Sequence, residues 1–392
     1  MTLRLQGKGG VFGAPGKAVG STKDCVGLTA LDVGVPGKAG LLVSGSGAPV
    51  LLIPGAGGAF TVRPLKADPA LAKGSGGFGR CLVADFDGDG LADVLQPGSR
   101  AGLMYKGKGG GSFATGARSR VALGRGRSGS FVGDWDHDGL LDVFAAAQDT
   151  CRLWNNKGGF VFHNMLGLSG EIAYISKPGG FGGGVCDVNN DGHQDILITY
   201  PGTLPQIFFN RAFRSFGHAH KLALGALGEA PPDGEPVNQE PELAPDEEDM
   251  TGEQAGLVRD LNGDGAEDLV VVFRHHKRKK AKGGAKPGPW ETGAHHGEIW
   301  FFPRQVDQDA AFAARVALPP GKGFAGPLTV TGWAKKQCLG AWNVVPGTTE
   351  AFFGRPEAGP VEVRWRLPGG KRQRRIVVLE DGPARLVIGD EK

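Results

Sequence analysis

The stretch LVADFDGDGLADVL, Leu82 to Leu95, places aspartates at the first, third, fifth and ninth positions of a loop between two apolar segments. The same pattern, D-x-[DN]-x-D-G-x-x-D, recurs without gaps in FVGDWDHDGLLDVF, GVCDVNNDGHQDIL and LVRDLNGDGAEDLV, which end at Phe144, Leu197 and Val270. A fifth segment, LTALDVGVPGKAGLLV, keeps Asp32 but lacks the other acids. A turn needs only one or two such residues. Four intact copies therefore predict a repeated loop with a chemical role.

The composition favours a large all-β chain. A length of 392 residues exceeds one small domain and accommodates a large β domain with an appendage. The 69 glycines and 26 prolines recur in phase with apolar runs, which favours tight turns over disorder. A net charge of +3 indicates no particular partner, and no apolar run approaches the roughly 20 residues that span a bilayer.

The acidic loops belong to a repeat of about fifty residues. Their first aspartates, counted from Asp32, follow one another at spacings of 53, 49, 53 and 73 residues. Between them lies a second repeated element, a strand and a Gly- or Asn-rich turn that ends at Phe60, Phe113, Phe162, Phe216 or Phe312. Four short strands in this period are typical of a β-propeller blade. We predict an all-β propeller of six or seven four-stranded blades.

The two ends of the repeat array predict how the ring closes. The segment TLRLQGKGGVF, ending at Phe12, is a second hairpin without a first, and Leu328 to Val345 resembles a first hairpin without its acids. Pairing of the two would close the ring and remove exposed sheet edges. The alternative is that the N-terminal hairpin is the remnant of a longer chain. We expect a propeller over 1–345 and a small β region over 346–392.

Two segments interrupt the period around the fifth blade. Residues 229–254 are acidic and proline-rich, and residues 274–296 contain the basic run RHHKRKKAKGGAKPGP. Both are expected to be solvated loops. A basic run binds nucleic acid in some proteins, but this one lacks interleaved aromatic residues and lies near an acidic insert. We therefore expect no nucleic-acid partner.

The acidic loops have the chemistry of a site for a hard divalent cation. Alternate residues of a tight turn point inward, and glycine at the sixth position permits a sharp bend. Calcium accepts six to eight oxygen ligands with relaxed geometry, whereas magnesium needs a near-ideal octahedron. Zinc and copper are poor candidates because soft ligands are lacking. We predict about four Ca²⁺ sites, and apo-state repulsion among the carboxylates should couple metal binding to folding.

The predicted ligands come from the same positions of each loop. The backbone carbonyls belong to the seventh position: Leu91, Leu140, His193 and Ala266. The side chains are Asp85, Asp87, Asp89 and Asp93; Asp134, Asp136, Asp138 and Asp142; Asp187, Asn189, Asp191 and Asp195; and Asp260, Asn262, Asp264 and Asp268. The last two sites hold three carboxylates instead of four, so we expect them to bind more weakly.

The predicted metal sites and the cysteines bear on location. Extracellular calcium modules bind with dissociation constants of roughly 10⁻⁴–10⁻³ M, too weak for resting cytosol. The start, MTLRLQGKGG, lacks the apolar core of a signal peptide. We expect an extracellular, cell-surface or periplasmic protein whose leader is absent from this chain; the alternative is a cytoplasmic protein. The five cysteines form no C-x-x-C, and most should be buried in strands: Cys25, Cys81, Cys151, Cys186 and Cys338.

The loops resemble the FG-GAP or VCBS repeats of the integrin α-subunit propeller and of many bacterial surface proteins, over about residues 1–317. The tail is similar to the ASPIC/UnbV region of cartilage acidic protein and its bacterial relatives, through Phe353-Gly354 and VEVRWRLPGGK. In the family's turn, tryptophan is followed directly by proline, whereas here Arg366 and Leu367 intervene. The resemblance implies an extracellular, calcium-stabilised binding platform of six or seven blades.

Catalytic motifs are lacking. The sequence contains no G-x-S-x-G, no H-E-x-x-H and no Gly-rich phosphate loop followed by Lys-Ser/Thr. We therefore expect a non-catalytic module that binds protein or glycan at the cell surface, in an oligomeric state that the sequence leaves open. A polysaccharide lyase or glycoside hydrolase is the alternative, with Trp290 and Trp300 as stacking platforms. The paired histidines and the arginine row of the tail are expected to be solvated: His275, His276, His295, His296, Arg364, Arg366, Arg372, Arg374 and Arg375.

Overall fold

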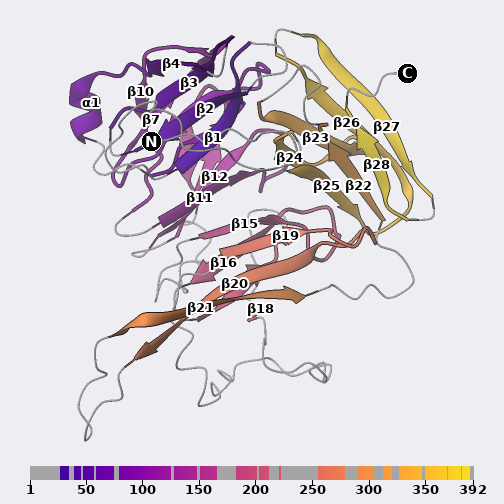
Figure 1. Cartoon of the computed structure of the whole chain (residues 1–392). Coiled ribbons are helices and arrows are strands. Elements are labelled where there is room, and N and C mark those ends of the chain that lie inside the picture. The colour runs from indigo at the N-terminus through magenta and orange to yellow at the C-terminus, as the bar shows by residue number, and fades with distance from the viewer. Residues whose placement is uncertain are drawn as a thin grey trace, which may run out of the picture.

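A computed structural model gives the structure of most of the chain and confirms the all-β, propeller-like prediction (Figure 1). The residues that it describes are 27–34, 39–45, 47–56, 59–74, 79–124, 128–147, 151–165, 182–200, 203–211, 220–221, 255–278, 290–302, 312–319, 326–346, 349–368, 370–380 and 382–388. The acidic insert 229–254 and the N-terminal hairpin ending at Phe12 lie outside these residues, so ring closure stays a prediction.

Four antiparallel sheets of four strands follow one another between residues 27 and 221. Their orders are β1-β2-β3-β4, β5-β6-β7-β10, β11-β12-β13-β14 and β15-β16-β17-β18, and the short β8 and β9 pair as a separate hairpin. The strands are β1 (Gly27–Asp32), β2 (Ala39–Ser44), β3 (Val50–Pro54), β4 (Phe60–Pro64), β5 (Leu82–Ala84), β6 (Asp93–Gln96), β7 (Gly102–Tyr105), β8 (Gly107–Gly109), β9 (Ser112–Phe113), β10 (Ala117–Ser119), β11 (Ser128–Gly133), β12 (Asp142–Ala147), β13 (Arg152–Asn156), β14 (Phe162–Asn164), β15 (Gly182–Cys186), β16 (Asp195–Tyr200), β17 (Thr203–Phe208) and β18 (His220–Lys221). This up-and-down order is that of propeller blades.

One helix, α1 (Pro69–Gly74), joins the first two of these sheets. Its first turn is capped because Ala70 N donates to the carboxylate of Asp68 at 2.8 Å, and Pro69 has the backbone angle of a first helical residue. In the part of the chain that the structure describes, none of the helices has the length and apolarity of a membrane span.

A fifth sheet contains β19 (Ala255–Arg259), β20 (Asp268–Arg278) and β21 (Trp290–Phe302). The expectation of a loop over 274–296 was wrong at both ends of the insert, because the β20–β21 ladder extends into it and pairs Arg274 with Gly297. The strand beginning at Phe312 was expected to complete this sheet. It instead leaves for the C-terminal region, so the described part of the fifth sheet has three strands.

The C-terminal strands form two sheets, β25-β22-β28 and β24-β23-β26-β27. Because β23 pairs with β26, the boundary expected between 345 and 346 runs through a single sheet. In the other sheet, β22 pairs antiparallel with β25 and parallel with β28. The strands are β22 (Phe312–Ala317), β23 (Leu328–Ala334), β24 (Gln337–Val344), β25 (Glu350–Arg355), β26 (Gly359–Arg366), β27 (Arg372–Leu379) and β28 (Ala384–Val387).

These seven strands share one hydrophobic core. Alternate residues of β23 and β26 are buried, as expected for strands with one face on a core. Val330 of β23, Phe353 of β25 and Trp365 of β26 belong to the same buried cluster as Ala314 and Val316 of β22. Residues 312–388 therefore form a two-sheet unit, which we call the C-terminal sandwich.

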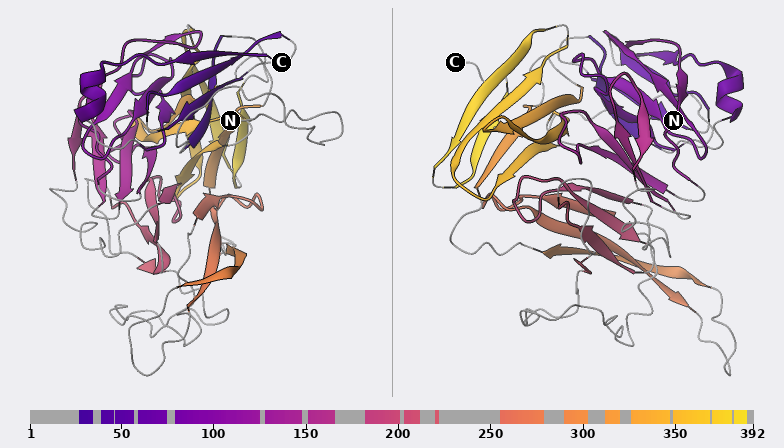
Figure 2. Two further views of the ribbon diagram at one scale, coloured as in Figure 1. Left: turned by 60° about the vertical axis from the view of Figure 1, so that its left-hand side comes forward. Right: turned by 180° about the vertical axis from the view of Figure 1, so that it is seen from behind.

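The sheets surround a central cavity of about 380 Å³. Its lining comes from β1, β5, β11, β15 and β19, which are the first strands of the five sheets, and from β24 and β25 of the C-terminal sandwich. Figures 1 and 2 show the sandwich, in yellow, beside the first sheets, with the β15–β21 sheets below both. Strand β12 is buried along its whole length, and its three alanines let neighbouring sheets approach closely.

Replacement of Phe353 by Ala tests whether the C-terminal sandwich is one cooperative core. Its side chain is 1% exposed, so Phe353→Ala should lower the free energy of unfolding by about 3–5 kcal/mol in urea titrations. Ile376→Ala is the control, because Ile376 is 67% exposed on β27 and its loss should cost under about 0.5 kcal/mol. Equal effects of the two changes would contradict the shared core.

Candidate metal centre

Each of the four acidic loops connects the first strand of a sheet to the second: β5 to β6, β11 to β12, β15 to β16 and β19 to β20. The first aspartate directly follows the first strand, and the ninth begins the second strand. The first strand of each of these sheets lines the central cavity. Because each acidic loop directly follows this strand, all four loops lie at the same end of their sheets.

The first-position aspartate organises each loop through hydrogen bonds from the loop's own amides. One carboxylate oxygen of Asp85 accepts from Gly90 N at 2.8 Å, and the other accepts from Asp89 N at 3.1 Å. The bond from the sixth-position glycine recurs in the other loops, on Asp134, Asp187 and Asp260. The bond from the fifth-position amide recurs on Asp134 and Asp187. The first carboxylate therefore fixes the bend of the loop.

The ninth-position aspartate ties the loop to the sheet. One oxygen of Asp93 accepts from Phe86 N at 2.9 Å, and the other accepts from Gly107 N, just past the third strand, at 2.8 Å. Asp142 and Asp195 make the same two kinds of contact, and Asp268 accepts from Leu261 N. These four carboxylates are at most 1% exposed. Charge-assisted bonds of this kind hold the loop in one conformation.

The fourth and sixth positions need left-handed backbone. The sixth-position glycine has φ of 85° or 86° in all four loops, which explains why no other residue occurs there. The fourth position also has positive φ and is occupied by Gly88, His137, Asn190 and Gly263. Asparagine and histidine are enriched among non-glycine residues of this conformation. This second constraint lies at a position that the sequence motif leaves open.

The first, third and fifth aspartates of two loops converge. Ligand oxygens of Asp85, Asp87 and Asp89 lie within 4.8 Å of one another, and so do those of Asp134, Asp136 and Asp138. Asp93 and Asp142 are not part of these groups, because their oxygens face backbone amides. In the other two loops, the third-position amide donates to the fifth-position carboxylate: Asn189 to Asp191 and Asn262 to Asp264, both at 2.8 Å.

Cationic and amide groups contact the third-position carboxylates in the first two loops. The ammonium of Lys106 pairs with both Asp87 and Asp89. In the second loop, Asn155 Nδ2 and Lys157 Nζ contact Asp136 at 2.9 and 3.0 Å. A positive group at the point where two carboxylates meet shows that this point favours a cation.

Adjacent loops are joined through their eighth positions. The side chain of Gln194 accepts from Asp134 N at 2.6 Å and donates to Ala341 O of β24 at 3.0 Å. The carboxylate of Glu267 likewise accepts from Asp187 N. The eighth residue of one loop thus receives the first amide of the preceding loop, and Gln194 also ties the loops to the C-terminal sandwich.

Two buried asparagines, Asn156 and Asn210, form a second kind of contact between adjacent loops. Asn156 Nδ2 donates to Phe86 O of the preceding loop at 2.8 Å and to Leu141 O of its own loop at 3.1 Å. Asn210 makes the equivalent contacts with Trp135 O and Gln194 O. The sequence signal for these contacts is the asparagine at the end of the WNN and FFN segments, which we expected only as part of a turn.

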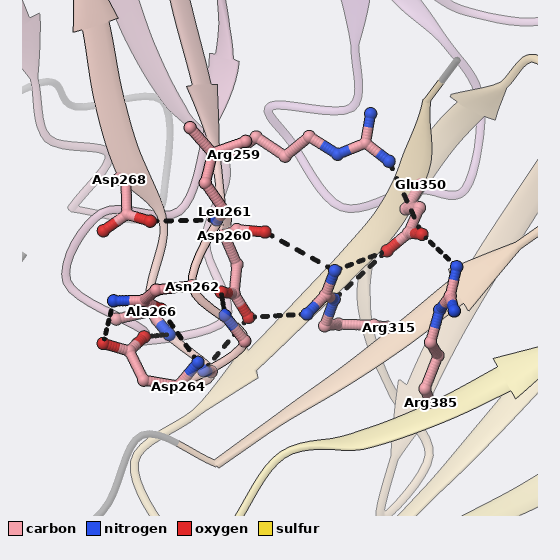
Figure 3. Close-up of polar contacts among 12 residues, drawn as sticks. Arg259, Asp260, Leu261, Asn262, Asp264, Ala266, Asp268, Arg315, Glu350 and Arg385 are labelled. Atoms are coloured by element: carbon pink, nitrogen blue, oxygen red, sulfur yellow. Dashed lines mark hydrogen bonds and ion pairs between the residues drawn. The ribbon is translucent and has the colours of Figure 1, made fainter. Parts of the chain in front are cut away.

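The fourth loop is held by arginine (Figure 3). Arg315 of β22 pairs with Asp260 at 2.9 Å and with Glu350 at 3.0 Å. Arg259 and Arg385 contact the same Glu350 at 3.5 and 2.7 Å. Partial burial opposes ionisation of Glu350, but Arg385 and Arg315 outweigh it and lower the pKa of this carboxyl. A guanidinium on Asp260 competes with a metal ion, so this loop should hold a cation least strongly.

Two histidines touch where the second and third loops meet. The rings of His137 and His193 stack with centroids 4.4 Å apart, and their Nδ1 atoms are 3.1 Å apart. Burial, and then the neighbouring His193, lower the pKa of His137 to about 4. His137 is therefore neutral at physiological pH, which lets the two rings stack without charge repulsion.

Burial shifts the titration of the loop carboxylates. It raises the pKa of Asp85 to about 6, of Asp93 to about 7 and of Asp195 to about 8. Burial also raises the pKa of Asp134, Asp142 and Asp187 well above the ordinary value, and neighbouring carboxylates add to the increase. A bound cation would offset both effects by favouring the ionised form.

The described cysteines are buried thiols, as the sequence analysis expected for most of them. Cys81, Cys151, Cys186 and Cys338 are at most 5% exposed, and Cys25 lies outside the described residues. Burial raises the pKa of Cys81 to about 12, so this thiol is not a reactive thiolate. The side chains of the four paired histidines and of Trp290 and Trp300 also lie outside the description.

Comparison with known proteins supports the repeat assignment. The family described as FG-GAP-like repeat matches residues 85–145 and 134–198, which contain the first three acidic loops. This match does not include the C-terminal region, whose resemblance to ASPIC/UnbV stays a prediction. None of the curated proteins matches the sequence significantly.

One solved structure shares the fold at low sequence identity, and another aligns with a lower score. A lectin of Agrocybe aegerita, described as recognising non-reducing terminal N-acetylglucosamine, is 18% identical with a TM-score of 0.50; the alignment covers 77% of this chain and 79% of the lectin. The Tc holotoxin pore of Photorhabdus luminescens is 14% identical with a TM-score of 0.35, over 90% of this chain and 17% of the toxin chain. At this identity, the lectin supports the fold alone.

The buried carboxylates predict an unusual pH dependence of the metal-free chain. An unfolded aspartate has a pKa of about 3.9, so the folded chain binds more protons than the unfolded one up to pH of about 8. Stability in EDTA should therefore be highest near pH 4 and fall as the pH rises to about 8. Urea titrations across this range measure it, and stability that increases over the same range would contradict the burial of these groups.

Asn156 offers a test of the junction between loops. Its side chain is 0% exposed and makes three hydrogen bonds, two of them to carbonyls of adjacent loops, so Asn156→Ala should lower the free energy of unfolding by about 1–3 kcal/mol in urea titrations. The exposed Ser112→Ala is the control and should change it by less than about 0.5 kcal/mol. If Asn156→Ala is as mild as the control, the asparagine does not join the loops.

Proposed function

We propose that this chain is an extracellular binding and scaffolding module without catalytic activity, in which Ca²⁺ bound to the acidic loops stabilises a β-propeller. The observation that supports the proposal is that the ligand positions of each loop differ in burial and in the groups that they contact. The first and ninth carboxylates accept hydrogen bonds from backbone amides, and all of them except Asp85 are buried. The third and fifth side chains are less buried. The fifth carboxylate accepts the seventh-position amide, and the two side chains also meet one another or a cationic group.

The donor set fits a hard divalent cation. In the first two loops, three carboxylates already lie within 4.8 Å of one another, and oxygen ligands at this spacing suit calcium. Asp85, Asp87 and Asp89 would hold the ion in the first loop, and Asp134, Asp136 and Asp138 would hold it in the second. The seventh-position carbonyls and the ninth-position carboxylates remain proposed ligands. The ion would neutralise charge that burial makes unfavourable.

The third and fourth loops are proposed as weaker sites. Each replaces the third-position aspartate by asparagine, which removes one negative charge from the donor set. In the fourth loop, Arg315 also pairs with Asp260. We therefore propose that the first two loops fill at the lowest calcium concentration, and that the fourth loop fills last.

The cavity at the centre of the sheets supports a non-catalytic role. Of its acidic lining residues, Glu350 pairs with three arginines, Asp260 pairs with Arg315, and the carboxylate of Glu267 accepts a hydrogen bond from Asp187 N. Arginines lower the pKa of Glu350, which makes it a poor proton donor, whereas sugar-cleaving enzymes need one carboxyl group that remains protonated. This arrangement favours a binding module over the alternative of a polysaccharide lyase or hydrolase.

Binding of a glycan or protein partner at the cell surface is the proposed role of the propeller. The chain contains FG-GAP-like repeats and shares its fold with a lectin described as recognising N-acetylglucosamine. Propellers bind partners through loops carried on a rigid ring of sheets. The four loops described above would supply this rigidity when they hold calcium.

Calcium titration tests the proposal. Excess Ca²⁺ should raise the melting temperature of EDTA-treated protein and abolish the fall in stability between pH 4 and pH 8. Isothermal titration should resolve at least one tight class of sites, and Asp138→Asn should weaken one of them at least about tenfold. Melting curves that coincide in EDTA and in Ca²⁺ would contradict the proposal.

Two variants serve as controls in the same titration. Glu380 is exposed and lies outside the loops, so Glu380→Gln should leave calcium binding unchanged. Lys106→Met removes the ammonium that contacts Asp87 and Asp89, so calcium binding to the first loop should be retained or strengthened. Loss of calcium binding in Lys106→Met would show that the lysine is part of the site and not a competitor.

A further inference from the structure

A surface pocket of about 610 Å³ lies between the second and third sheets, outside the acidic loops. One wall comes from Arg100, before β7, and from the β10 region with Arg118 and Arg120. The opposite wall comes from β13 and β14, with Trp154 and His163. Pockets that bind small ligands have volumes of roughly 300–1,000 Å³.

The charged residues that line this pocket are all cationic. Three arginines and Lys157 line it, and its lining includes no acidic residue. Arg100, Arg118 and Arg120 are exposed, and among the described residues none of the three has an acidic partner. Lys157 also reaches Asp136 of the second loop at 3.0 Å. Arginine forks bind carboxylate and sulfate-like oxyanions in a bidentate way, so the pocket is suited to an anion.

An indole face lies among these cations. Trp154 is half-buried, and its Nε1 donates to Ala122 O at 3.0 Å, which fixes the plane of the ring. The neighbouring Arg152 donates to Leu123 O at 3.1 Å and anchors the same strand to the β10 side. A fixed aromatic face with polar groups around it is suited to a ligand that has one apolar face and polar edges, as a sugar ring has.

The charge pattern favours an acidic sugar over nucleic acid. Nucleic-acid sites that lack base readout follow the backbone with a long positive groove and several stacking residues. Here the cations meet in one pocket with one indole, and the acidic second loop lies beside it through the Lys157–Asp136 pair. The negative charge of that loop opposes the approach of a long polyanion.

We propose that the pocket between the second and third sheets binds a saccharide that carries carboxylate or sulfate groups, with its ring on Trp154 and its anionic groups on Arg100, Arg118 and Arg120. This inference rests on the proposed function, in which the propeller is a binding module, and specifies the class of ligand and its place. His163, at the edge of the pocket, adds a further donor.

Titration calorimetry of the full chain in excess Ca²⁺ tests the inference with defined probes. A heparin hexasaccharide supplies sulfate groups, a galacturonate hexamer supplies carboxylates alone, and cellohexaose is the neutral control. One saturable site is expected for at least one acidic probe, and the probe that binds identifies the anion. Cellohexaose should bind at least about tenfold more weakly, because it lacks the charges that the arginines pair with.

Two variants locate the site. The double variant Arg118→Ser/Arg120→Ser should weaken the acidic probe at least about tenfold, and Trp154→Leu should weaken it as well. Arg372→Ser/Arg375→Ser is the matched control, since it removes the same charge from exposed positions of β27 and should leave the affinity unchanged. Melting curves of each variant verify that it is folded.

Four results would overturn the inference: no binding of either acidic probe, equal losses in the pocket variant and its control, equal affinity for cellohexaose, or tighter binding of a single-stranded oligonucleotide. Calcium titration of the same samples separates this failure from that of the proposed function. Arg118 and Arg120 lie outside the loops, so Ca²⁺ should still bind to that variant. Calcium binding without binding of an acidic sugar refutes the pocket alone, whereas wild-type protein that binds no Ca²⁺ refutes the proposed function.

Discussion

Buried aspartate carboxylates that accept hydrogen bonds from backbone amides are the constraint on which this fold depends. In every one of the four loops, the first carboxylate holds the sixth amide and the ninth carboxylate holds the second amide. Each bond satisfies an amide that the bend would otherwise leave without a partner. In the first three loops, burial raises the pKa of these carboxylates, and neighbouring carboxylates add to the increase. The loop is thus well ordered and electrostatically unfavourable at once, a combination that favours cation binding.

The loops also connect the sheets to one another. Gln194 and Glu267 receive the first amide of the preceding loop, and Asn156 and Asn210 join carbonyls of two loops. A cation in one loop would therefore stabilise the conformation of its neighbours. Gln194 extends this network to β24, so the C-terminal sandwich is fixed against the same end of the sheets.

The repeated loop made much of the fold predictable. Alternating apolar strands, the fixed glycine and the period near fifty residues sufficed for the all-β architecture and for the position of each loop. The oxygens of Asp85, Asp87 and Asp89 lie close together, as alternation in a tight turn predicts, whereas their role as metal ligands stays a prediction. The contacts of Asp93 were less predictable, because its partner Gly107 lies beyond the third strand and only the folded sheet brings the two together.

The C-terminal region shows where a repeat pattern misleads. The segment that begins at Phe312 has the spacing of a fourth strand, yet it pairs with β25 and β28, more than thirty positions along the chain. This short apolar strand is compatible with the fifth sheet and with the C-terminal sandwich. Which of the two it joins therefore depends on which partner strands bury Ala314 and Val316 better. The eighth-position Gln194 and Glu267 were missed for a related reason, since their partners belong to a different sheet.

The most direct test of this account is a crystal structure of the chain grown with Ca²⁺, with anomalous scattering used to locate the ion. The account predicts peaks among the first, third and fifth side chains of the first and second loops, with Lys106 displaced from Asp87 and Asp89. Loops that keep Lys106 between these carboxylates, with no anomalous peak at saturating Ca²⁺, would contradict it.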